Sequence, residues 1–74
     1  MASFLFLAIS VACDADFLRV TLVDGREIAV PLVWFPRLLD ATPAQRGNWR
    51  LIGRGQGIHW PDLDEDLSVA GLLR

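Results

Sequence analysis

The sequence predicts an α+β fold, a small domain that combines an antiparallel β-meander and hairpins with one or two short helices and a C-terminal helical turn. Three observations support this prediction. Apolar and polar side chains alternate over residues 17–30, around an Asp24-Gly25 pair that favours a tight turn. Residues 32–41 change to the apolar spacing of a helix. Residues 49–60 alternate again around three glycines, which indicates a second hairpin.

The first expected element is a buried strand over residues 4–12, where most side chains are apolar. This run has the length of a signal-peptide core, but no Lys or Arg precedes it. It is also too short to cross a bilayer. We therefore expect a cytoplasmic protein with no membrane segment, in which Cys13 is a small hydrophobic residue rather than a reactive thiol.

The next expected elements are two paired strands, residues 17–22 and 26–30. Each has an apolar face at every second position, and the turn between them carries the sequence signal most typical of a hairpin. Pro31 is expected to end the second strand because it has no N–H group to donate to a ladder. The side chains predicted to face the core are Leu18, Val20, Leu22, Ile28 and Val30.

Two short helices are expected after this hairpin. Pro36 is tolerated only in the first turn of a helix, so the first helix is predicted to start near Trp34 or Phe35. Thr42 is a suitable N-cap for a second short helix that begins at Pro43 and stops at Asn48.

The last third of the chain is predicted to form a second hairpin and a helical turn. Residues 49–52 and 58–60 are the expected strands, and the glycine-rich segment 53–57 is their flexible tip. That segment lacks the features of a phosphate-binding loop. Residues 62–66 are expected to be an acidic turn. Leu67 is expected to begin a final apolar element, with Ser68 as the cap of a turn through Val69, Leu72 and Leu73.

Composition excludes several classes of protein. The chain of 74 residues is short enough for one domain over residues 1–74, and one Cys with one His rules out an internal disulfide or a Cys/His zinc site. A content of 53% hydrophobic residues and three tryptophans argues against disorder. The net charge of −2 argues against strong affinity for nucleic acid. No cofactor and no catalytic residue are predicted.

The charge is unevenly distributed and suggests an interaction surface. Residues 37–54 carry four arginines and one aspartate, whereas residues 55–74 carry four acidic residues and one arginine. So small a chain cannot bury all three tryptophans, and tryptophan and arginine dominate interface hot spots. We therefore expect a partner-binding face, on another protein or in a homo-oligomer, formed by Trp34, Phe35, Arg37, Arg46 and Trp49. The acidic residues Asp64, Glu65 and Asp66 are expected to pair with arginines. The alternative without a binding role is that the aromatic residues simply form the core and the charged residues lie in solvent with weak local ion pairs.

Two other functions stay open. Carboxylates two residues apart beside an imidazole could bind a divalent cation or act as a general base. A metal-assisted enzyme such as a nuclease is thus the alternative, and it would use His59, Asp62, Asp64 and Glu65. A DNA-binding role is weaker, and its candidate residues are Arg37, Arg46, Arg50 and Arg54.

Two specific motifs carry a resemblance to a known family. Residues 24–39 read DGREIAVPLVWFPRLL, and residues 57–68 read GIHWPDLDEDLS. Over residues 16–73 the chain resembles a family of small bacterial proteins, domain of unknown function 2442 (DUF2442). Residues 1–7 lie outside the recognised part. The matching motif residues are Trp34, Phe35, Pro36, Arg37, His59, Trp60, Pro61, Asp64, Glu65 and Asp66.

The resemblance implies a small α+β domain but no established activity. Some members are fused to a helix-turn-helix, and members are often encoded beside another small protein in what resembles a toxin–antitoxin pair. The resemblance therefore favours a non-catalytic, antitoxin-like partner over an enzyme.

Overall fold

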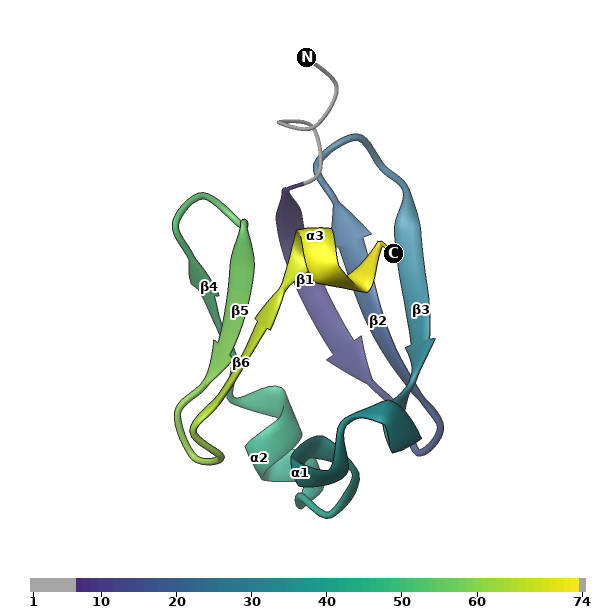
Figure 1. The fold of residues 1–74 in the computed structure, drawn as a ribbon, viewed down its shortest axis with the longest axis vertical. Helices are drawn as coiled ribbons and strands as arrows, with labels where there is room; N and C mark the ends of the chain where they lie inside the picture. Colours follow the sequence, from purple (N-terminus) through teal and green to yellow (C-terminus); the bar gives the residue numbers. More distant parts are fainter. Residues whose placement is uncertain (1–6, 74) are drawn as a thin grey trace.

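The computed structural model describes residues 7–73 and contains two three-stranded antiparallel sheets (Figure 1). In both sheets the strands lie in chain order. The first sheet consists of β1 (Ala8–Cys13), β2 (Phe17–Leu22) and β3 (Glu27–Pro31), and the second of β4 (Arg50–Ile52), β5 (Gly57–Trp60) and β6 (Glu65–Ser68). The helical segments are η2 (Leu32–Trp34), α1 (Pro36–Leu39), α2 (Pro43–Gly47) and α3 (Val69–Leu72). This architecture confirms the predicted α+β fold class.

The first hairpin forms as the alternation predicted. Leu18 pairs with Val30 and Val20 with Ile28, so the apolar side chains of both strands share one face. Gly25 closes the turn with a φ of +93°, a conformation that glycine adopts at little cost. The predicted core residues of this hairpin are buried, except that Ile28 is half-buried.

The first strand, β1, pairs with β2 as the predicted meander requires. β1 runs over Ala8–Cys13, whereas the sequence predicted residues 4–12. Residues 4–6 of that prediction lie outside the described residues. A register irregularity between Ala8 and Ser10 interrupts the pairing near the start of β1.

The helical connection follows its proline and cap signals. Pro36 occupies the first turn of α1, and a short 3₁₀ turn, η2, precedes it. Thr42 forms a capping box with Gln45: its hydroxyl accepts from the Gln45 N–H at 3.1 Å, while its own N–H donates to Gln45 Oε1 at 3.0 Å. Figure 1 shows α1 and α2 at the same end of both sheets, where they connect β3 to β4.

The second sheet corrects one prediction. Residues 62–66 were expected to be an acidic turn, but the turn ends at Asp64 and residues Glu65–Ser68 form strand β6. Asp64 has a φ of +50°, which reverses the chain, and Leu67 then pairs with Ile58 on β5. The burial of Leu67 against the core therefore outweighs the poor strand propensity of the acidic residues.

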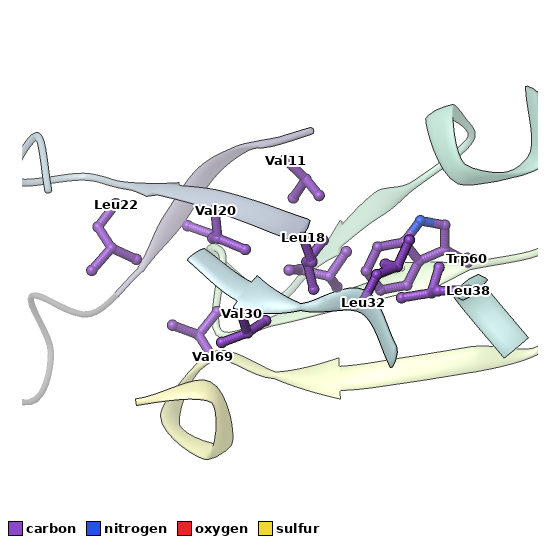
Figure 2. Close-up of a cluster of buried hydrophobic side chains, with 11 residues drawn as sticks. Val11, Leu18, Val20, Leu22, Val30, Leu32, Leu38, Trp60 and Val69 are labelled. Atoms are coloured by element: carbon purple, nitrogen blue, oxygen red, sulfur yellow. The ribbon is translucent and has the colours of Figure 1, made fainter. Parts of the chain in front are cut away.

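One hydrophobic cluster contains side chains from both sheets and from the helical segments (Figure 2). Trp60 is its largest fully buried side chain, and its indole N–H donates to the Arg46 carbonyl at 3.0 Å. The cluster consists of Ala8, Val11, Leu18, Val20, Leu22, Val30, Leu32, Leu38, Ile58, Trp60 and Val69. Across residues 7–73, no helix has both the length and the apolar character needed to cross a membrane.

The turn between β4 and β5 joins the two sheets. The Ala8 N–H, at the start of β1, donates to the Gly55 carbonyl at 2.8 Å. Gly55 has a φ of +103°, and a Cβ at this position would lie 2.8 Å from the Ala8 nitrogen. The approach of β1 to this turn therefore requires a glycine.

Candidate functional site

A groove of about 310 Å³ lies between η2 and strand β6. Trp34 stands at its rim with 63% of its surface exposed, and Phe35 is half-buried beside it. The remaining lining residues come from β6 and α3. The lining residues are Trp34, Phe35, Asp66, Leu67, Ser68, Gly71 and Leu72.

The exposure of Trp34 follows from the local sequence. Pro31 ends β3, and the chain then makes the single 3₁₀ turn of η2, closed by the Phe35 N–H donating to the Leu32 carbonyl at 2.9 Å. The turn points Leu32 into the core, where it is fully buried, and leaves Val33 and Trp34 in solvent. Because Leu32 anchors the η2 turn in the core, the turn holds the Trp34 side chain outward.

Arg37 fixes α1 to the turn that precedes β6. Its guanidinium donates to the Asp64 carbonyl at 2.9 Å and to the Leu63 carbonyl at 3.4 Å. Glu65 lies at the ion-pair limit, 4.0 Å from the same nitrogen. The predicted pairing of an arginine with the acidic segment thus occurs within the chain, and it holds one end of β6 close to α1.

Arg46 and Trp49 line a different hollow. Arg46 donates to the Leu38 and Leu39 carbonyls at 2.7 and 2.6 Å, where it satisfies the C-terminal end of α1. With Trp49, which is half-buried against the core, it lines a second hollow of about 320 Å³ beside Cys13. The two hollows share no lining residue. The residues expected in one face are therefore divided, with Trp34 and Phe35 in the groove and Arg46 and Trp49 outside it.

Cys13 is half-buried in this second hollow. Burial raises the pKa of its thiol, and this effect outweighs the opposing effect of the Arg46 charge. A raised pKa leaves less of the reactive thiolate at neutral pH. The side chain thus fits the role of a small hydrophobic residue.

The polar cluster after His59 does not converge on one point. The imidazole Nδ1 of His59 hydrogen-bonds across the sheet to the carboxylate of Asp66. Asp62 accepts from the Asn48 amide at 3.0 Å, on another side of the turn. Between residues 7 and 73, no three His, Cys, Asp or Glu side chains lie close enough together to hold a metal ion. The residues named for a metal site, His59, Asp62, Asp64 and Glu65, therefore do not form such a group in this part of the chain.

The four arginines considered for DNA binding differ in what they contact. Arg37 and Arg46 donate to main-chain carbonyls, as described above. Arg50 and Arg54 are exposed on β4 and on the turn that follows it.

Sequence reasoning did not anticipate the edge of β6. Asp66 was predicted as a partner of arginine, and Ser68 only as a helix cap, yet both line the groove. The alternation of Leu67 with the polar residues on either side was the available signal, but the acidic run obscured it.

These features define a small α+β protein with two antiparallel sheets and an exposed aromatic groove. The model of the family described as protein of unknown function (DUF2442) matches residues 8–74, and the chain belongs to this family. The match extends further toward the N-terminus than the recognised motifs did.

One solved structure is similar along most of the chain. It is the crystal structure of a protein of unknown function from Rhodospirillum rubrum, with 32% sequence identity and a TM-score of 0.77. The similarity covers 90% of this chain and 83% of that one. No curated protein matches the chain.

Proposed function

We propose that this protein is a non-catalytic protein-interaction module whose docking surface is the groove between η2 and β6. The observation that carries the proposal is the contrast between two tryptophans. Trp60 is fully buried in the core, whereas Trp34 is 63% exposed beside an apolar groove. Its partner is another protein, in an antitoxin-like role, or a second copy of the chain.

The energetic argument concerns the exposed surface of Trp34. A tryptophan side chain buries up to about 250 Å², so covering the exposed fraction would remove about 150 Å² from water. At about 25 cal/mol per Å², this burial corresponds to a transfer free energy of roughly 3–4 kcal/mol, from which the entropic cost of association is subtracted. Tryptophans at the centre of an interface, surrounded by apolar contacts, are the residues that most often dominate binding.

The test compares Trp34→Ala with Ile9→Ala, which removes an exposed apolar side chain that does not line the groove. Sedimentation velocity reports self-association, and affinity capture from a bacterial lysate followed by mass spectrometry reports other partners. We expect the wild type and Ile9→Ala to associate in at least one assay and Trp34→Ala to lose that association.

Two results would contradict the proposal. One is a wild-type protein that stays monomeric at high micromolar concentration in sedimentation velocity and also captures no other protein from the lysate. The other is a Trp34→Ala variant that associates as well as Ile9→Ala.

A further inference from the structure

β6 is an edge strand, and its outer side faces the groove. The second sheet has the order β4-β5-β6, so β6 is paired on one side only. In an antiparallel pair, alternate residues direct their N–H and C=O groups toward the partner strand. The Val69 N–H donates to the Gln56 carbonyl across this pair. It follows that Glu65 and Leu67 also turn their main chain toward β5, whereas Asp66 and Ser68 turn theirs outward.

The outward groups form a short hydrogen-bonding edge. Asp66 presents its N–H and C=O, and Ser68 presents its N–H, beside the groove that both residues line. Among the described residues, no hydrogen bond outside the β5–β6 pair involves the main-chain N–H or C=O of Asp66, whose carboxylate alone is bound, by His59. At the other end, the Asp64 carbonyl is taken by Arg37 at 2.9 Å, which limits how far an added strand can extend.

We propose that the groove accepts an extended strand of a partner protein, which adds to β6 as a fourth strand of the second sheet and carries alternating basic and apolar side chains. Its main chain would pair with Asp66 and Ser68. Its apolar side chains would enter the groove among Phe35, Leu67 and Leu72, and Trp34 would cover them. Main-chain pairing supplies affinity in this type of recognition, and alternate side chains supply specificity. This inference rests on the proposed function and deepens it.

Charge determines which strand fits. The Asp66 side chain is 67% exposed, and its pairing with His59 lies on the β5 side, away from the open edge. An added strand would place one of its side chains at cross-strand distance from Asp66, where a basic residue is favourable and an acidic one is not. Asp62 and Asp64 make the neighbouring turn acidic as well.

The same argument disfavours a second copy at this edge. Two β6 strands paired about a two-fold axis at Asp66 would bring this aspartate opposite its own copy, and like charges directly opposite each other destabilise a strand pair. Self-association through β6 is therefore a competing outcome that the test must detect.

The first arm of the test uses a short blocked peptide in which valine and arginine alternate, titrated calorimetrically against the whole protein. Two isomeric peptides carry N-methyl groups on either the valine or the arginine amides. Because successive N–H groups of a strand point to opposite sides, only one isomer loses the groups that face β6. We expect that isomer to bind more than about tenfold more weakly and the other to bind nearly as well as the parent.

The second arm uses a matched pair of protein variants. Asp66→Asn removes the charge beside the groove, and Asp62→Asn removes a similar charge that accepts a hydrogen bond from Asn48 and lines no part of it. We expect the Asp66 variant to bind the parent peptide about threefold more weakly and the Asp62 variant to bind it unchanged. Thermal melting checks that both variants are folded.

The outcomes separate this inference from the proposed function. Strand addition is refuted by absent peptide binding, by equal binding of the two methylated isomers, or by equal effects of the two variants. It is also refuted if the wild-type protein forms a dimer that displaces the peptide, because β6 would then bind a second copy of the chain. In each case the comparison of Trp34→Ala with Ile9→Ala still decides whether the protein is an interaction module.

Discussion

Gly55→Ala tests the joint between the two sheets. The backbone of Gly55 has a φ of +103°, and an alanine there costs about 1–2 kcal/mol in backbone strain. Its Cβ would also meet the backbone of Ala8, so β1 must move. That movement weakens the hydrogen bond from the Ala8 N–H to the Gly55 carbonyl, which contributes about 1 kcal/mol. The expected loss is about 2–3 kcal/mol in the free energy of unfolding.

The matched control is Gly25→Ala. Gly25 has a φ of +93°, nearly the same strain, but a Cβ there meets nothing within 4 Å. Its expected loss is therefore the backbone strain alone, about 1–2 kcal/mol. A chain of 74 residues has a total stability of about 4–11 kcal/mol, so the difference between the two variants is measurable.

Urea denaturation followed by tryptophan fluorescence gives both free energies of unfolding, and circular dichroism gives the melting temperatures. Each kcal/mol corresponds to about 4–8 °C for a domain of this size. If Gly55→Ala is no less stable than Gly25→Ala, the close approach of β1 to the turn does not contribute to stability and the reasoning fails.

Two further predictions concern local hydrogen bonds. Main-chain N–H groups of Asp16 and Phe17 donate to the Asp14 carboxylate at 2.8 and 2.7 Å and hold its pKa below the usual value. A depressed pKa in the folded state means that this stabilisation is present above the unfolded pKa and is lost as the pH falls through the folded pKa. Asp14→Asn should therefore reduce the decline of melting temperature with acidification, and an unchanged acid profile would contradict this assignment. Thr42→Ala removes the capping box with Gln45 and should lower the free energy of unfolding by about 1 kcal/mol, measured by urea denaturation. A loss no larger than that of Ser68→Ala, whose cap bond to Gly71 is longer at 3.3 Å, would show that the box adds nothing beyond a single cap.

Much of the fold could be predicted because its signals are local. The first hairpin depends on period-two alternation and on Asp24-Gly25, and each acts over a few residues. The helix starts depend on Pro36, Pro43 and the Thr42 cap, which specify their own backbone geometry.

The strand β6 could not be predicted from such signals. Glu65 and Asp66 have low strand propensity, and the run that contains them reads as a turn. They form a strand because Leu67 pairs with Ile58, an interaction across the sheet that becomes visible only when the fold is known. The charges are tolerated because β6 lies at a sheet edge.

The candidate site was predicted in part. An exposed tryptophan was expected from the small size of the chain, and the structure shows that Trp34 is the most exposed of the three. The sequence could not show that Arg46 donates to the carbonyls of α1, because that contact depends on how α2 folds back. Grouping Arg46 with Trp34 followed from proximity in sequence, which is a weak guide once a helix, α1, lies between them.

The order of strands has a consequence for how the chain folds. Each sheet is built from strands adjacent in the sequence, so its pairing can form from local contacts, which favours rapid folding. The hydrogen bond between Ala8 and Gly55 instead joins distant parts of the chain, and its formation requires the two sheets to meet. Docking of two meanders that have already paired would then be the late step. Interactions absent from the transition state act mainly on the unfolding rate, so this joint governs how long the folded protein persists rather than how fast it forms.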